Sequence, residues 1–241
     1  MTRLNASIDV RGLGIQFHFD RQRRVLSPTL ARIRRGGPAP WALRGIHLSV
    51  GPGEGVALVG RTGSGKTTLL RLLGGILAHD EGGLEVRGRV GTLLSPQAGL
   101  LGLLTGRENA ELLGVLVGMT PRQARAAVEP IRQVSGLGES FELPVSSYSE
   151  GMRARLGFAV AAQQDLDLLL LDEVHEAMDH EFRAVVAERA EAVRAGGGIV
   201  VAAGHDHAVL ATMCDRAVWM DSGGVSHDGD FHAVVDMYVS S

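Results

Sequence analysis

Lys66 is the only lysine in a chain of 241 residues, and it lies in the stretch GRTGSGKT, residues 60–67. This stretch fits the spacing G-x-x-x-x-G-K-[ST], in which backbone amides surround a phosphate group. A lysine ammonium on its flexible stem can reach over that phosphate, where the wide planar fork of an arginine would not fit. The hydroxyl after the lysine can serve Mg²⁺. The predicted phosphate site comprises Gly60, Arg61, Thr62, Gly63, Ser64, Gly65, Lys66, Thr67 and Thr68.

A second group of candidate residues follows the apolar run in DLLLLDE, residues 167–173. Adjacent residues of a strand point to opposite faces, so Asp172 could serve Mg²⁺ while Glu173, at the strand exit, addresses a water molecule. Taken alone, the two acids could equally be solvated side chains at the end of a core strand.

Two further motifs have an ordinary structural interpretation when each is considered alone. In SSYSEGMRARLGFAVA, residues 146–161, Ser149 is a candidate N-cap. With Gly151 it would form a helix start that faces an anion. His205 follows the apolar run 199–203, where a lone histidine is usually structural.

The segments around these residues predict a parallel α/β arrangement. Residues 56–59 read as a buried strand before the glycine-rich loop, and the leucines at 69, 70, 72 and 73 form one face of a helix that ends at Gly74. The uninterrupted apolar strands indicate a parallel sheet covered on both faces.

Residues 96–157 are predicted to be helical. Thr105 with Glu108, and Thr120 with Gln123, match the capping-box spacing. Pro130 is expected to kink or end the second of these helices.

Composition excludes several classes of protein. The net charge of −3 argues against nucleic acid as the main partner. Cys214 is the single cysteine, which rules out an internal disulfide and fits a reducing cytosol. The first residues lack an apolar signal core, and no apolar run approaches the roughly 18 residues of a membrane span. If the protein serves a membrane, another chain must cross it.

The order of the motifs resembles the ATPase of ABC transporters over about residues 8–238. The similarity is greatest to the subfamily that exports lipid-linked polysaccharides such as O-antigen, teichoic acid, capsule or galactan. That subfamily shows TGREN, present here at 105–109, and a YSxGMxARLxFAVA pattern, present at 148–161, while the general LSGGQ signature is absent.

This resemblance implies an α/β P-loop NTPase fold, with a RecA-like parallel-sheet core and ABC antiparallel β and helical subdomains. It also implies a homodimer that sandwiches two ATP molecules and Mg²⁺, each ATP lying between one chain's loop and the other chain's Ser149 and Gly151. By resemblance, Glu173 is the general base, His205 the switch histidine, and Asp179 part of the loop that crosses the dimer interface. The sequence VHEAMD, residues 174–179, departs from the subfamily's usual VLAVGD.

Two positions remain open within the resemblance. Gln97 is the candidate Mg²⁺-sensing glutamine beside Thr67 and Asp172, although we expect that residue one position earlier, and Gln97 could instead be a loop side chain facing solvent. Phe17 best matches the aromatic that stacks on adenine, but a core role is equally compatible. Phe19 and Trp41 are the alternatives.

We expect one ABC ATPase domain over residues 1–241, with a core of 1–95 and 158–241, a helical subdomain of 96–157 and no C-terminal carbohydrate-binding domain. A basic insertion at about 21–40 would be either a short solvated helix or a helix at the membrane surface. The expected partners are a second copy and a separate permease at the cytoplasmic face of the cell membrane. An ATPase of another ABC transporter (a drug exporter or an importer), or a soluble ABC ATPase, is the alternative.

Overall fold

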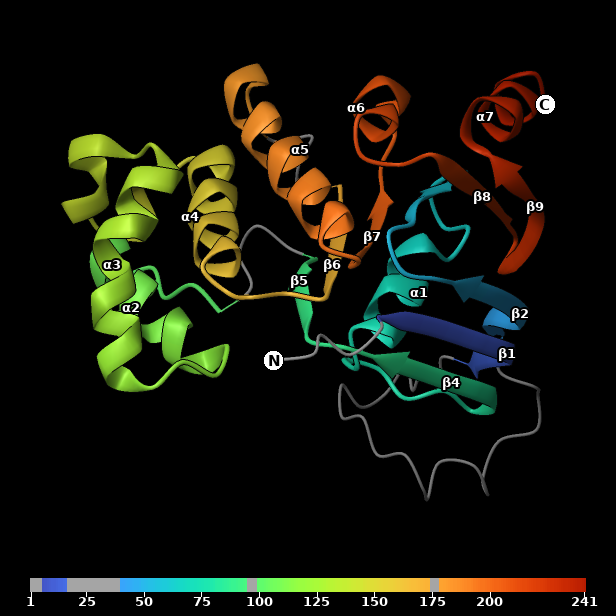
Figure 1. Ribbon diagram of the computed structural model, residues 1–241, viewed down its shortest axis with the longest axis horizontal. Helices are drawn as coiled ribbons and strands as arrows, with labels where there is room; N and C mark the ends of the chain where they lie inside the picture. The colour runs from blue at the N-terminus through green and yellow to red at the C-terminus, as the bar shows by residue number, and fades with distance from the viewer. Residues whose placement is uncertain (1–5, 17–39, 95–98, 174–177) are drawn as a thin grey trace.

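The computed structural model describes residues 6–16, 40–94, 99–173 and 178–241. In these ranges the chain forms two β-sheets with helices on both sides of the larger one, and a group of helices at one end (Figure 1). No described helix is both long and apolar enough to cross a membrane.

The larger sheet has six strands in the order β5-β6-β7-β3-β8-β9. Neighbouring strands pair in parallel except for β8 and β9, which form an antiparallel hairpin. Every residue of β3, β6 and β7 is buried, which confirms that these apolar runs are covered on both faces. The strands are β3 Gly55–Val59, β5 Val90–Leu93, β6 Leu168–Asp172, β7 Ile199–Ala203, β8 Arg216–Asp221 and β9 Gly224–Asp230.

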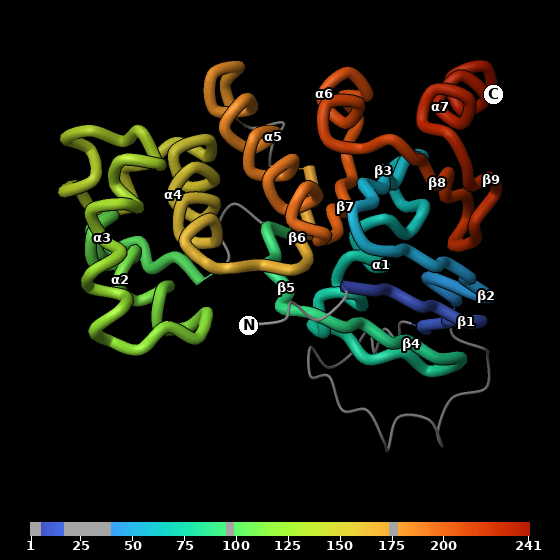
Figure 2. The backbone as a smooth tube through the Cα atoms, viewed as in Figure 1, coloured from blue at the N-terminus to red at the C-terminus, as the bar shows by residue number. Residues whose placement is uncertain are grey.

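One face of this sheet packs against helix α1, Lys66–Leu73, and a three-stranded antiparallel sheet. Figure 2 shows α1 between the two sheets. Val56 and Leu58 of β3 point to this side, together with the predicted leucine face of α1. The smaller sheet has the order β2-β1-β4, with β1 Ser7–Gln16, β2 Trp41–Val50 and β4 Glu81–Arg87.

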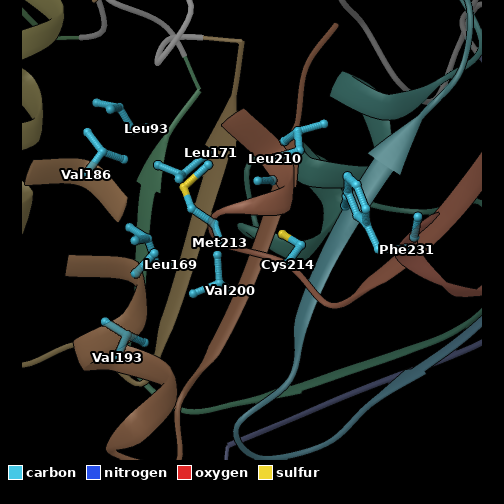
Figure 3. Close-up of a cluster of buried hydrophobic side chains, with 14 of the residues drawn as sticks. Leu93, Leu169, Leu171, Val186, Val193, Val200, Leu210, Met213, Cys214 and Phe231 are labelled. Atoms are coloured by element: carbon cyan, nitrogen blue, oxygen red, sulfur yellow. The ribbon is translucent and has the colours of Figure 1, made fainter. Parts of the chain in front are cut away.

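The opposite face of the larger sheet is covered by the helices after β6, β7 and β9. Ala57 and Val59 of β3 point to this side, as the two-residue period of a strand requires. Figure 3 shows the apolar cluster there, in which Leu169 and Leu171 of β6 lie near Val186 and Val193. The helices are α5 His180–Ala195, α6 His207–Ala211 and α7 Phe231–Val239.

The helical group lies beside the β5 end of the sheet (Figure 1). Both predicted capping boxes are present, at Thr105 with Glu108 and at Thr120 with Gln123. These helices share a third apolar cluster. The elements are α2 Gly106–Leu116, α3 Pro121–Ser135, the 3₁₀ turns η2 Gly138–Glu142 and η3 Val145–Ser147, and α4 Glu150–Ala162. Helix α4 runs without a break past the subdomain boundary that we placed at residue 157.

Pro130 was expected to kink or end the second helix, and it does not end it, because α3 continues through it to Ser135 and is capped by Gly136, which has φ 61°. Proline removes one backbone donor, and the carbonyl that loses its partner belongs to Ala126. Both Pro130 and Ala126 are exposed. Water can therefore satisfy that carbonyl, and the helix tolerates the missing bond.

Candidate functional site

The loop between β3 and α1 has the backbone conformation that its glycines predict. Gly60 has φ 143°, and a Cβ there would lie 2.2 Å from the Met220 carbonyl oxygen. Gly65 has φ 108°, and a Cβ there would lie 2.4 Å from a Leu43 methyl carbon. Both positions therefore require glycine, which keeps the backbone amides open for an anion.

Lys66 is the first residue of α1, and it is only 4% exposed. Its Nζ donates hydrogen bonds to the carbonyl oxygens of Gly60 at 2.7 Å and Arg61 at 3.3 Å. The ammonium group is thus held across the loop by two of the loop's own carbonyl oxygens. The hydroxyl of Ser64 in the same loop is buried and has no hydrogen-bond partner among the described residues.

A pocket of about 530 Å³ lies over this loop. Trp41 and Glu173 line it together with the loop residues, so an aromatic side chain and a carboxylate share the pocket with the phosphate loop. The complete lining is Trp41, Ala42, Thr62, Gly63, Gly65, Lys66, Thr67, Thr68, Glu173, Ser222 and Gly223.

Sequence reasoning missed the contribution of the β8–β9 turn to this pocket. The Gly223 N–H donates to the Ser64 carbonyl oxygen at 3.1 Å, and Ser222 has a positive φ of 47°. The sequence DSGG at 221–224 signals a tight turn, but nothing in it indicates which loop the turn contacts.

Asp172 and Thr67 form the part of the site that suits Mg²⁺. Asp172 is the last residue of β6 and is 7% exposed, and the Thr67 side chain hydrogen-bonds to it. Burial raises the pKa of the Asp172 carboxyl, as does repulsion from Glu173, while the Thr67 hydrogen bond and the charges of Arg71 and Lys66 oppose this rise.

The oxygen ligands available at Asp172 and Thr67 suit Mg²⁺. Asp172 Oδ1 is buried with no hydrogen-bond partner among the described residues, which leaves one carboxylate oxygen available as a ligand. The described ranges contain no group of three or more His, Cys, Asp or Glu side chains suited to a metal. Mg²⁺ does not need such a group, because it commonly uses one carboxylate, waters and substrate phosphates.

Glu173 and His205 meet at the carboxyl ends of the adjacent parallel strands β6 and β7. His205 Nε2 lies 3.2 Å from Glu173 Oε1, and the Glu173 N–H donates to the Ala203 carbonyl oxygen at 2.9 Å. Glu173 has φ 52°, a left-handed conformation that is unusual for a residue with a side chain. This turn places its carboxylate in the pocket with the loop, while Asp172 remains buried.

Ser149, Gly151 and Asp179 line a different pocket, of about 570 Å³, at the start of α4. Ser149 caps α4 by accepting the Met152 N–H at 3.2 Å, as predicted. Asp179 caps α5 and forms an ion pair with Arg155 of α4. Within one chain, these three residues therefore do not share the pocket of the glycine-rich loop.

Several predicted residues lie outside the described ranges. These are Phe17, Phe19, Gln97 and the basic segment up to residue 39. Of the three aromatic candidates, Trp41 is described, and it lines the loop pocket.

The sequence pattern of the family described as ABC transporter matches residues 43–176. The O-antigen export system ATP-binding protein RfbB of Myxococcus xanthus is 39% identical over 188 residues, which are 78% of this chain and 43% of that protein. A Klebsiella pneumoniae protein of the same name is 33% identical over 82% of this chain and 80% of its own length. The teichoic acids export ATP-binding protein TagH of Enterococcus faecalis is 34% identical over 83% and 45%, respectively. The chain thus spans less than half of two of these three relatives.

Solved structures confirm the predicted fold class. The dimeric post-hydrolysis structure of the ATP-binding cassette MJ0796 bound to ADP and Pi superposes with a TM-score of 0.76, covering 93% of this chain and 98% of that one at 20% identity. A second dimeric structure of MJ0796, a bacterial ABC transporter cassette, gives 0.75 at 21% identity. Together with the family match, these findings show that the chain belongs to the ABC transporter family.

Proposed function

We propose that this chain is the ATP-hydrolysing subunit of an exporter that moves a lipid-linked cell-surface polysaccharide across the cytoplasmic membrane. The observation that carries the ATPase part is one pocket that joins Lys66, Thr67 and Glu173 to the glycine-rich loop. The class of transported substrate rests on relatives named for O-antigen and teichoic acid export. The ATPase of a different ABC transporter is the second candidate.

In this proposal the loop amides and the Lys66 ammonium bind the β- and γ-phosphates of ATP. Thr67 and Asp172 would hold Mg²⁺, which neutralises phosphate charge when it is bound. The pocket next to Trp41 would receive the adenine, with the ring of Trp41 as the described aromatic surface. The Cζ of Arg44 lies 5.1 Å from the centre of that ring, which helps to hold the ring in place.

Glu173 would orient a water molecule toward the γ-phosphorus and accept its proton as the new P–O bond forms and the bond to ADP breaks. His205, 3.2 Å from that carboxylate, would hold its direction. The left-handed backbone at Glu173 serves the same purpose, because it brings the carboxylate out of the strand and into the pocket.

The separate pocket at Ser149, Gly151 and Asp179 supports the proposal of a homodimer. The start of α4 presents backbone N–H groups and a capping serine, a surface that favours an anion. Because this surface is not part of the loop pocket of its own chain, it would bind the ATP held by a second copy.

An exposed apolar patch supports a membrane-spanning partner. Leu101, Leu103 and Leu143 are 51%, 93% and 51% exposed. Their segments run side by side, since the Gly106 N–H donates to the Leu143 carbonyl oxygen at 3.2 Å and the Val145 N–H to that of Leu104 at 2.9 Å. Large exposed side chains grouped in this way mark a protein-binding surface. We assign this patch to the permease, at the cytoplasmic face of the membrane.

The test of the ATPase proposal is Glu173→Gln, assayed for Mg²⁺-dependent ATP hydrolysis and for dimer formation by light scattering. Loss of a general base lowers the rate by about 10²–10⁴. The variant should therefore bind ATP, accumulate as an ATP-bound dimer and turn over slowly. Turnover close to that of the unmodified protein would refute the role given to Glu173.

The substrate class is tested separately. The chain is co-purified with its permease, and ATPase activity is measured with lipid-linked glycans and with unrelated amphiphilic drugs. Stimulation by the glycans alone supports polysaccharide export, whereas stimulation by the drugs alone supports the second candidate.

A further inference from the structure

Helix α5 carries three arginines, of which Arg183 and Arg194 are about three helical turns apart and so lie on the same face. Each lies near one end of the helix, and each bonds to residues that flank α6. The two arginines therefore connect α5 to both ends of the segment between β7 and β8.

Arg194 makes the connection at the end away from the loop pocket. Its guanidinium donates to the carbonyl oxygens of Gly53 at 3.0 Å and Met213 at 3.1 Å, and to Asp215 Oδ2 at 2.7 Å. Gly53 precedes β3 and Asp215 precedes β8, so these contacts lie at the amino ends of the strands. This cluster fastens α5 to the sheet, and its hydrogen bonds go to none of the described candidate site residues.

Arg183 makes the connection at the carboxyl ends of the strands, where the candidate site lies. Its Nε donates to the Met178 carbonyl oxygen at 3.0 Å, and its Nη1 donates to Asp206 Oδ2 at 3.2 Å. The other oxygen of Asp206 accepts the Val209 N–H at 3.2 Å and so caps α6. Asp206 directly follows His205 in the chain.

The planar guanidinium thus binds two segments at once. One is the end of the loop that carries Asp179, next to Met178, and the other is the turn that carries His205. An arginine fork suits this task because its donors point in fixed directions, which a lysine ammonium cannot reproduce. The Arg183 and Asp206 side chains are 30% and 38% exposed. A pair this exposed adds little to stability. Its main effect is therefore to fix the orientation of the turn that carries His205.

We infer that Arg183 is a positioning residue for ATP hydrolysis, which sets His205 against Glu173 by fixing the Asp206 turn to the Met178 carbonyl. This inference rests on the proposed ATPase function. A catalytic group that is misplaced by about 1 Å can lose about 10²-fold in rate. Arg183→Gln should therefore lower kcat for ATP by about 10- to 100-fold and leave KM within about twofold, because the phosphate loop is untouched.

Four variants test the inference. Arg183→Lys should recover only part of the lost kcat, since it keeps the charge but not the two-directional fork. Asp206→Asn keeps an oxygen for the α6 cap but turns an amide NH₂ toward Arg183, so it should lower kcat in the same way. His205→Ala removes the side chain that Arg183 is inferred to position, and Arg183→Gln added to it should cause no further loss. Additive losses in that double variant would overturn the inference.

Arg194→Gln is the matched control, because it lies on the same face of the same helix and removes three hydrogen bonds. It should lower the melting temperature while the kcat of the folded protein stays unchanged. If Arg183→Gln behaves like this control, with full kcat, then Arg183 is only structural. Should Arg183→Gln fail to fold, Asp206→Asn decides the question by the same two readouts.

The proposed ATPase function is tested in the same assay by the unmodified chain and by Glu173→Gln. If the unmodified chain does not hydrolyse ATP, or Glu173→Gln hydrolyses it normally, the ATPase assignment fails. If both behave as proposed while Arg183→Gln and Asp206→Asn retain full kcat, only the positioning inference fails.

Discussion

Replacing Asp172 by asparagine should make the ligand-free protein more stable and weaken its stabilisation by Mg²⁺ with ATP. The Asp172 side chain is buried, and its Oδ1 has no partner among the described residues. A buried polar group without a partner costs about 1–3 kcal/mol, and a charged one costs more. Asparagine has nearly the same shape and keeps an oxygen for Thr67. We therefore expect Asp172→Asn to unfold with a free energy about 1–2 kcal/mol higher than the unmodified chain at pH 7 in EDTA.

Saturating Mg²⁺ and ATP should reverse this order. A ligand at a hundredfold excess over its Kd stabilises the folded state by about 2.7 kcal/mol. The unmodified chain should gain this stabilisation in full, whereas the asparagine variant, which lacks the anionic ligand for Mg²⁺, should gain less. Urea unfolding in EDTA measures the stability of each protein without ligand, and unfolding in Mg²⁺ plus ATP measures the stabilisation by the ligands. A Glu173→Gln background prevents hydrolysis during the titration.

The stability difference between Asp172→Asn and the unmodified chain should depend on pH in a defined direction. Burial raises the pKa of folded Asp172 above its ordinary value of 3.8, so the folded state holds this proton more tightly than the unfolded state. The resulting stabilisation is complete below pH 3.8 and is lost as the pH rises through the folded pKa. The advantage of Asp172→Asn should therefore shrink as the pH is lowered toward 3.8.

Asp165→Asn is the control, because its side chain is 64% exposed and lies just before the same strand. It should change stability by less than about 0.5 kcal/mol and keep the full Mg²⁺ response. The reasoning is refuted if Asp172→Asn is the less stable protein in EDTA, or if Mg²⁺ and ATP stabilise it as much as the unmodified chain.

Two further predictions concern the same site, and a third concerns the basic insertion at about residues 21–40. Lys66→Arg should strongly reduce ATP turnover and cost about 1–3 kcal/mol of stability, because the larger fork must fit at a position that is 4% exposed; equal activity in a steady-state assay would contradict the argument from shape. Glu173→Gly should be more stable to urea than Glu173→Ala by about 1 kcal/mol, reversing the usual order, since φ is 52° there; an alanine variant of equal stability would argue against backbone strain. Neutralising Arg32, Arg34 and Arg35 of the basic insertion together should leave the ATPase activity of the isolated chain intact but lower glycan-stimulated activity with the permease; no change in the glycan-stimulated activity would assign the insertion to packing.

The sequence alone determined those features whose contacts are local along the chain. The glycine-rich loop, both capping boxes and the Ser149 cap depend on residues only a few positions apart, so their spacing carries the geometry. The strands β3, β6 and β7 could also be predicted from their apolar runs, because a strand buried on both faces has no polar alternation.

The tertiary structure decided the contacts between segments that are distant in sequence. The register of β6 against β7 brings Glu173 to His205, and the β8–β9 turn reaches the Ser64 carbonyl. Neither contact follows from a local pattern, because it depends on how neighbouring strands align. The same is true of Arg183, which in the sequence is one of three arginines within residues 180–195. Only the packing of α5 against α6 places it between the Met178 carbonyl and Asp206, because a side chain acquires such partners from the fold and not from its neighbours in the chain.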